Sequence, residues 1–209
     1  MPQYKLYYFD VRALAEPIRQ IFAYAGVPFE DVRVPREQWP DKKSTMPFGT
    51  MPVLEIDGKP LPQSFAIARY LARQHGLAGK GAFEEAWVDA LADQFKDYFN
   101  DFRPFIAVFA GFVPGDKLFI QEKAKKEHAE PARDKFFPII EKRLAESKSG
   151  FLVGDGLTWV DLVLSEHVAT ISELPGFFDK YPKTVAHSAK VRAIPQLKKW
   201  IENRPKTPF

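Results

Sequence analysis

The sequence predicts an α/β unit at the N-terminus followed by an all-helical region that extends to the end of the chain. Three observations support this division. Two strand-like segments flank a helical pattern, and a hairpin pattern with an Asp57-Gly58 turn follows them. Three glycines then fall within residues 76–81, where hydrophobic periodicity is lost. Beyond them, apolar residues recur only at helical spacing. We therefore expect one domain over residues 1–78 and a second over residues 82–209.

Residues 4–9 form the first expected strand, because they are rich in aromatic residues and alternate between two faces. This alternation places Tyr4, Leu6 and Tyr8 on one face. Residues 12–26 follow with the apolar spacing of a helix, which ends at a glycine. Residues 29–34 read as a second strand. A strand, a helix and a strand in this order predict parallel pairing with a right-handed crossover.

A hairpin and a helix complete the N-terminal unit. Residues 36–43 are a polar segment, irregular or briefly helical, and the hairpin begins after Pro52. Because Pro52 has no N–H, the backbone groups of Met51 are left free to pair outside the sheet. Gln63-Ser64 opens a helix over residues 64–75, whose unpaired N-terminal amides favour a carboxylate. This stretch predicts either a slot for an extended, peptide-like anion or an ordinary capped hairpin. The β-α-β-α-β-β-α order is that of thioredoxin-like folds.

The second half of the chain shows only helical patterns. Phenylalanines recur every three or four residues along a long helix expected over residues 84–110. Residues 117–128 and 131–147 predict a helix pair or one helix kinked at Pro131. Thr158-Trp159-Val160-Asp161 resembles a capping box that opens a helix reaching about residue 174, which makes Asp161 structural. The last expected helix covers residues 194–203.

Composition excludes several classes of protein. The chain has 209 residues and 45% apolar residues, enough for a packed core, and contains no cysteine, which excludes disulfides and thiolate sites. The net charge of +3 is too small for a nucleic-acid-binding surface. The longest apolar run, residues 105–113, is too short to span a membrane. We expect a cytoplasmic protein with neither nucleic-acid nor membrane partners.

Several motifs in a specific order resemble the cytosolic glutathione S-transferases, with the sigma class of nematodes as the nearest group. The resemblance covers essentially the whole chain. It implies a thioredoxin-like domain and an all-helical domain, a homodimer, and an enzyme that conjugates hydrophobic electrophiles to glutathione, its co-substrate, with no permanently bound cofactor. The motifs are Tyr7-Tyr8-Phe9, Ala15-Glu16-Pro17-Ile18-Arg19, Trp39 with Lys43, Met51-Pro52, Gln63-Ser64 and Thr158-Trp159-Val160-Asp161.

The resemblance also implies roles for individual residues. Tyr8 resembles the catalytic tyrosine, whose hydroxyl donates a hydrogen bond to the glutathione sulfur; on its own it would read as a core tyrosine. The glutathione-binding set falls into three groups, holding the glycine end, the cysteinyl backbone and the γ-glutamyl group. These positions are Trp39, Lys43 and Gly49; Met51 and Pro52; and Gln63 and Ser64, with Asp97 reaching in from a partner subunit.

The electrophile is expected between the first loop and the long helix. The sequence departs from the sigma pattern at Leu14, where many members carry an arginine near the glutathione sulfur. Arg12 is the candidate to replace that arginine. Lys96 interrupts an acidic cluster on the long helix, so we expect no metal site. Two alternatives stay open, a non-catalytic carrier of haem or other apolar ligands and a prostaglandin-D isomerase. The expected apolar lining is Phe9, Val11, Leu14, Phe99, Phe102, Ile106 and Phe209.

Overall fold

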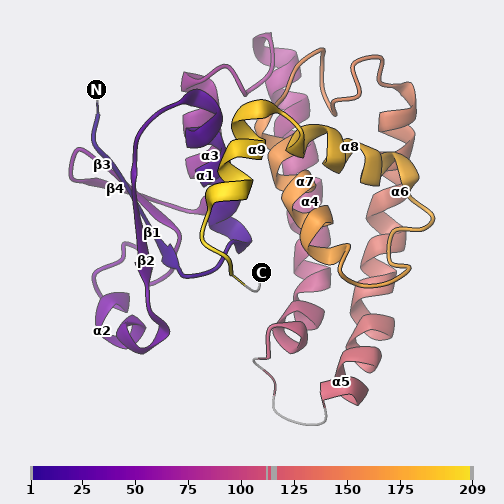
Figure 1. The fold of residues 1–209 in the computed structure, drawn as a ribbon, viewed down its shortest axis with the longest axis horizontal. Helices are drawn as coiled ribbons and strands as arrows, with labels where there is room; N and C mark the ends of the chain where they lie inside the picture. The colour runs from indigo at the N-terminus through magenta and orange to yellow at the C-terminus, as the bar shows by residue number, and fades with distance from the viewer. Residues whose placement is uncertain (1, 112, 114–116, 208–209) are drawn as a thin grey trace.

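Four strands in the order β2-β1-β3-β4 form one mixed sheet in the N-terminal unit (Figure 1). The structure is a computed structural model that describes residues 2–111, 113 and 117–207. β1 and β2 are parallel, and β3 and β4 form an antiparallel hairpin, as the sequence patterns predict. β3 is also antiparallel to β1, which the patterns did not address. The strands are β1 (Tyr4–Phe9), β2 (Glu30–Val34), β3 (Val53–Ile56) and β4 (Lys59–Pro62).

The first strand buries every second side chain. Tyr4, Leu6 and Tyr8 are buried and the residues between them are partly exposed, which confirms the predicted faces. A 3-10 turn at Ala13–Ala15 leads into α1 (Glu16–Ala25), which ends at Gly26 with φ 66°. α3 (Ser64–Gln74) packs against α1, whereas α2 (Trp39–Lys43) lies beyond the strand ends (Figure 1).

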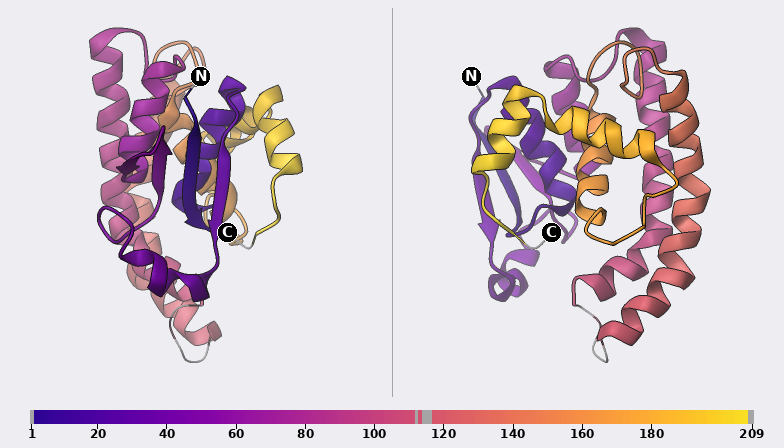
Figure 2. Two further views of the ribbon diagram at one scale, coloured as in Figure 1. Left: turned by 90° about the vertical axis from the view of Figure 1, so that its left-hand side faces the viewer. Right: turned by 45° about the vertical axis from the view of Figure 1, so that its right-hand side comes forward.

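Every helix after the first unit belongs to the C-terminal region. α4 and α6 are long and lie side by side, and α7 packs against both α4 and α1 (Figures 1 and 2). α5 continues through a π-helical segment, Lys125–Ala129, into α6, so the kinked-helix alternative is the one observed. Pro131, which has no N–H to donate, directly follows the π-helical segment inside this continuous helix. The helices are α4 (Gly81–Phe109), α5 (Lys117–Ala124), α6 (Glu130–Glu146), α7 (Trp159–Ile171), α8 (Pro182–Arg192) and α9 (Pro195–Asn203).

The start of α7 confirms the predicted capping box. The backbone N–H of Thr158 donates to Asp161 Oδ2 at 2.8 Å, and that of Leu152 donates to Asp161 Oδ1 at 2.9 Å. His187 Nε2 of α8 lies 2.7 Å from the same Oδ1. Asp161 therefore joins the loop before α7, the start of α7 and α8.

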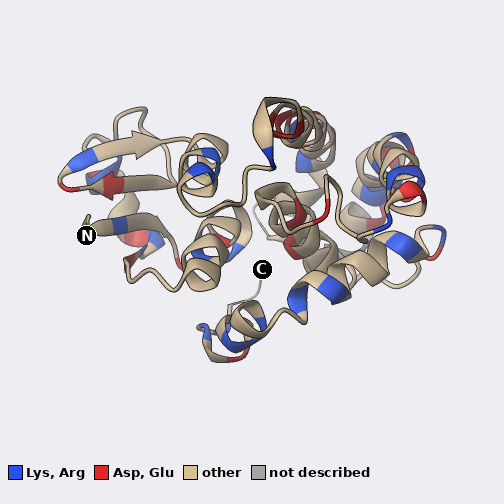
Figure 3. Cartoon of the chain, turned by 90° about the horizontal axis from the view of Figure 1, so that it is seen from above, with Lys and Arg blue, Asp and Glu red and all other residues tan. Residues whose placement is uncertain are grey.

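The two parts of the chain share one core. The backbone N–H of Trp159 donates to the backbone carbonyl of Leu77 at 2.9 Å. α9 packs against the first unit, where the indole Nε1 of Trp200 donates to Glu16 Oε1 at 2.7 Å. Figure 2 shows α9 beside α1. Basic and acidic residues are interspersed in the view of Figure 3. None of the helices in the described ranges is long and apolar enough to cross a membrane.

Candidate active site

A cleft of about 860 Å³ lies between the N-terminal unit and α4. It brings together residues from β1, the β1–α1 loop, α2, the turn before β3, the start of α3 and one face of α4. The size suits a ligand as large as a tripeptide with a second molecule beside it. Of the predicted site residues, Tyr8, Phe9, Val11, Leu14, Trp39, Met51, Pro52, Gln63, Ser64, Phe99 and Ile106 line this cleft.

Tyr8 is the last residue but one of β1, lines the cleft and is 7% exposed. Burial raises the pKa of its phenol, and the backbone amide of Leu14 and the charge of Arg19 lower it in part. The net direction is upward, so the hydroxyl keeps its proton at neutral pH. Tyr8 can therefore donate a hydrogen bond to an anion in the cleft.

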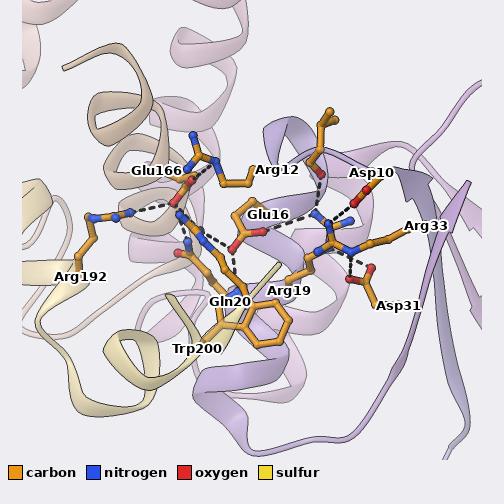
Figure 4. Close-up of polar contacts among 12 residues, drawn as sticks. Asp10, Arg12, Glu16, Arg19, Gln20, Asp31, Arg33, Glu166, Arg192 and Trp200 are labelled. Atoms are coloured by element: carbon orange, nitrogen blue, oxygen red, sulfur yellow. Dashed lines mark hydrogen bonds and ion pairs between the residues drawn. The ribbon is translucent and has the colours of Figure 1, made fainter. Parts of the chain in front are cut away.

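Arg19 fixes the loop that follows Tyr8. Its guanidinium is fully buried on α1; Nη1 donates to the Val11 carbonyl at 2.8 Å, and Nε donates to Asp31 Oδ1 at 3.0 Å (Figure 4). These bonds hold the β1–α1 loop, with Leu14, against the cleft. Arg12 does not line the cleft; its Nε lies 3.4 Å from Glu166 Oε1.

The opposite end of the cleft combines unusual backbone with an open helix start. Met51-Pro52 is a cis peptide bond, and Gln63 has φ 77°, a conformation uncommon for residues other than glycine. Gln63 is the N-cap of α3, so Ser64 is the first helical residue and not the capping residue that its sequence position suggests. Because no side chain caps α3, its first N–H groups can receive a carboxylate.

Three predicted glutathione-binding residues lie outside the cleft lining. Lys43 is exposed on α2, and its side chain passes over Gly49, with Cε 3.7 Å from where a Cβ on Gly49 would lie. Asp97 is exposed on α4. None of the three is among the residues that line the cleft in the described part of the chain.

The prediction for Phe102 needs correction. Its ring is fully buried, 5.3 Å between centroids from both Tyr98 and Phe105, and it lines neither this cleft nor the cavity behind it. The three- and four-residue steps of the phenylalanines include both the core-facing and the cleft-facing side of α4, and sequence spacing alone does not separate them. Phe209 lies outside the described residues.

A smaller cavity of about 90 Å³ adjoins the cleft behind Leu14, Phe99 and Ile106, which line both spaces. Its far wall belongs to α7 and includes His167, whose ring lies edge-on to Phe95 and Phe102. Burial lowers the His167 pKa to about 3, so this imidazole is neutral. The cavity can receive an apolar group a few atoms wide.

Sequence analysis missed a polar part of the cleft. Lys96, Asn100 and Arg103 line it from α4, and Arg36 lines it from the segment before α2. The α4 residues follow one another at four- and three-residue steps, as the phenylalanines do, so they share a helix side. That spacing was the available signal. Among the described residues, no group of three or more His, Asp or Glu side chains is arranged to hold a metal ion.

The chain matches known proteins over its whole length. Residues 4–73 match the family described as "Glutathione S-transferase, N-terminal domain", and residues 111–204 match "Glutathione S-transferase, C-terminal domain". It is 53% identical over 211 residues to "Probable glutathione S-transferase 5" of Caenorhabditis elegans, covering 100% of both chains.

Two solved structures from nematodes are equally similar in sequence. Monomeric Na-GST-3 of Necator americanus is 53% identical, with a TM-score of 0.93 and 99% and 100% coverage of the two chains. A Nu-class enzyme of Haemonchus contortus is also 53% identical, with a TM-score of 0.89 over 100% of both chains. The thioredoxin-like sheet unit and the helical region are therefore those of this family. The chain belongs to the glutathione S-transferase family.

Proposed function

We propose that Tyr8 stabilises the thiolate of glutathione in the cleft and so starts conjugation to an apolar electrophile. The protein is a glutathione transferase, with glutathione as its co-substrate. The observation that supports the role of Tyr8 is its position: a buried hydroxyl, protonated at neutral pH, that lines the same cleft as the open start of α3. The thiolate then attacks the electrophile, forming the C–S bond as the leaving group departs or the acceptor double bond takes up a proton.

The energy required is within reach of such a site. A thiol with a pKa of about 8.5 is only a few per cent ionised at neutral pH. Lowering that pKa by about two units makes the thiolate the major form and requires about 2.7 kcal/mol of preferential stabilisation. One or two charge-assisted hydrogen bonds provide this much.

Residues 1–78 are proposed to form the glutathione-binding domain, with glutathione lying along one edge of it. The α3 start, with Gln63 and Ser64, would receive the γ-glutamyl carboxylate. The Met51 backbone before Pro52 would pair with the cysteinyl part. Trp39, together with Lys43 and Gly49, would hold the glycine end; Lys43 is exposed on α2, so its ammonium is free to move toward the ligand.

The electrophile is proposed to lie across the cleft from glutathione, where the domain of residues 82–209 supplies the second wall. Its apolar contacts would be Phe9, Val11, Leu14, Phe99 and Ile106. The comparisons do not favour the two alternatives, a non-catalytic carrier of haem and a prostaglandin-D isomerase.

We further propose a homodimer in which Phe48 lies at the interface and Asp97 reaches the partner's glutathione. Phe48 is 65% exposed, so its ring is accessible to a second subunit, and Asp97 is exposed outside its own cleft. Because one relative is described as monomeric, molar mass by light scattering decides the matter. A monomeric mass would remove both roles.

The class and the location are finer proposals. We place the protein near the sigma class on the order and spacing of its motifs together, whereas one relative is described as Nu-class. Conjugation needs glutathione in its reduced form, and this condition supports the cytoplasm as the site of action.

The proposed role of Tyr8 is tested by the thiolate absorbance of bound glutathione against pH in the wild type, Tyr8→Phe and Tyr7→Phe. We expect a midpoint well below that of free glutathione, returning toward it only in Tyr8→Phe. Tyr7 is the matched control, because it is the neighbouring tyrosine on the other face of β1 and does not line the cleft. An unshifted wild-type midpoint, or one that Tyr8→Phe leaves in place, would refute the role of Tyr8.

A further inference from the structure

The α4 side of the cleft carries positive charge. Lys96 and Arg103 line it, and none of the described residues that line the cleft is Asp or Glu. Lys96 and Arg103 lie on α4, whereas Trp39 and Ser64, proposed to bind the ends of glutathione, lie on the opposite wall. The α4 cations are therefore placed to act on the second substrate.

Lys96, Asn100 and Arg103 form a polar strip along α4. At about 100° per residue, Phe95, Phe99 and Ile106 span about 40° of the helix circumference, and the polar strip begins about 40° beyond Phe99. Lys96 and Arg103 are separated by about 10 Å along the axis, at 1.5 Å per residue. The apolar and polar strips thus run side by side along one wall of the cleft.

Neither of these two cations is neutralised by an ion pair within the described part of the chain. Lys96 and Arg103 are exposed and make no ion pair with any described residue, whereas the nearby Asp101 pairs with Lys135 on α6 at 3.3 Å. A cation over an apolar surface attracts an anion once the body of the ligand is seated there. Either side chain can reach a carboxylate held between them, and the Asn100 amide can donate to the same group.

We propose that the electrophile site selects apolar electrophiles that carry an anionic group, bound by the strip of Lys96, Asn100 and Arg103 while their apolar body lies on Phe99 and Ile106. This inference rests on the proposed conjugation in the cleft. It adds a substrate class, an apolar electrophile with a carboxylate, to the general preference for apolar compounds. Lys96 and Arg103 are specificity-determining residues in this scheme and take no part in activating the thiol.

The test compares two electrophiles that differ by one charge, a chloronitrobenzoate and the matching chloronitrobenzamide. In both, the thiolate sulfur bonds to the ring carbon and chloride leaves with the electron pair. The measured quantity is the ratio of kcat/KM for the carboxylate to kcat/KM for the amide, taken for each variant relative to the wild type. Intrinsic differences in reactivity between the two compounds then cancel.

We expect Arg103→Gln and Lys96→Gln each to lower this ratio about two- to fivefold, the range of single exposed ion pairs. Arg103→Glu should lower it further, and added salt should lower it in the wild type. Lys148→Gln is the control for net charge, because Lys148 is exposed in the loop after α6 and does not line the cleft. It should leave the ratio unchanged.

Two results would overturn this inference and leave the proposed function standing. One is an unchanged ratio in Arg103→Gln and Lys96→Gln while both compounds are turned over. The other is that these variants raise the KM for glutathione and leave the KM for the carboxylate unchanged. The second would assign the strip to the co-substrate. Failure of the wild type to turn over either compound, together with an unshifted thiolate titration, would overturn the proposed function and this inference with it.

Discussion

The hydroxyl oxygen of Tyr98 on α4 lies 2.7 Å from Nε2 of His167 on α7. Burial lowers the His167 pKa to about 3 and raises the pKa of Tyr98 well above its ordinary value, so both partners are neutral. The imidazole also lies edge-on to Phe95 and Phe102, with centroids 5.3 Å away in each case. His167, the member of this neutral pair that lines the small cavity, is surrounded by aromatic rings, so its protonation would place a charge among them.

This pair predicts a loss of stability in mild acid. The folded-state pKa of His167, about 3, lies below the unfolded value of 6.5, so the unfolded chain binds the extra proton between these values. The contribution of His167 is complete above pH 6.5 and is lost as the pH falls toward 3. Between pH 6.5 and 5 it amounts to at most about 2 kcal/mol. We expect urea unfolding at pH 6.5 and at pH 5 to show a smaller loss of unfolding free energy between the two pH values in His167→Gln than in the wild type. Equal losses would contradict the neutral pair.

Phe102 and Phe99 should separate stability from activity. Phe102→Ala removes a fully buried ring and should lower the free energy of unfolding by about 3 to 5 kcal/mol. Phe99→Ala removes a partly exposed ring from the cleft wall, so its cost to stability should be smaller, while the KM for the electrophile should rise. Thermal unfolding and steady-state kinetics on both variants check this. A larger loss of stability in Phe99→Ala would mean that the cleft wall is the core.

Local pattern predicted β1, the turn between β3 and β4 and the start of α7, because each depends on residues close together in the sequence. Alternation along β1, the Asp57-Gly58 turn and the capping box at Thr158 all appear in the structure as expected. α8 was missed because its pattern is weak: it buries Thr184, His187 and Ser188, polar side chains that hydrophobic spacing does not reveal.

The site was harder to predict where residues distant in sequence decide the geometry. The position of the β1–α1 loop depends on Arg19 contacting Val11 and Asp31, a set that no sequence spacing joins. The place of Lys96 and Arg103 in the cleft lining was not predicted, since a lysine and an arginine at helical spacing look the same on a free surface and on a cleft wall. Only the position of the opposite wall distinguishes the two.

Asp161 is a buried residue whose substitution should cause a large loss of folding stability. Asp161→Ala removes acceptors from the N–H groups of Thr158 and Leu152 and from His187, all of them buried. Loss of a cap costs about 1 kcal/mol and each buried donor left unpaired about 1 to 3 kcal/mol more, so we expect a loss of about 3 kcal/mol or more. Denaturant unfolding measures it. Asp179→Ala, at an exposed position, is the control and should stay within about 0.5 kcal/mol of the wild type.

The buried carboxylate of Glu166 on α7 binds residues of α1, α8 and the C-cap of α9, and its removal should loosen the C-terminal end of the described chain. Gln20 and Arg192 each donate to its Oε2 at 3.0 Å, and Arg204 Nη1 donates to the same atom at 3.2 Å (Figure 4). Glu166 is 3% exposed. Glu166→Gln removes the carboxylate that pairs with Arg192 and one of the two that pair with Arg204, which keeps Glu16. Removing one partner of a buried ion pair costs about 3 to 5 kcal/mol.

The network also predicts non-additivity. Arg192 is more exposed than Glu166, so Arg192→Gln alone should cost less, and the double variant should lose less stability than the sum of the two single changes. Hydrogen exchange should locate the effect: amides of α9, whose next residue Arg204 also donates to Glu16 Oε1 at 2.6 Å, should exchange faster in Glu166→Gln. Additive losses, or exchange in α9 unchanged from the wild type, would show that Glu16 and Trp200 hold this helix without Glu166.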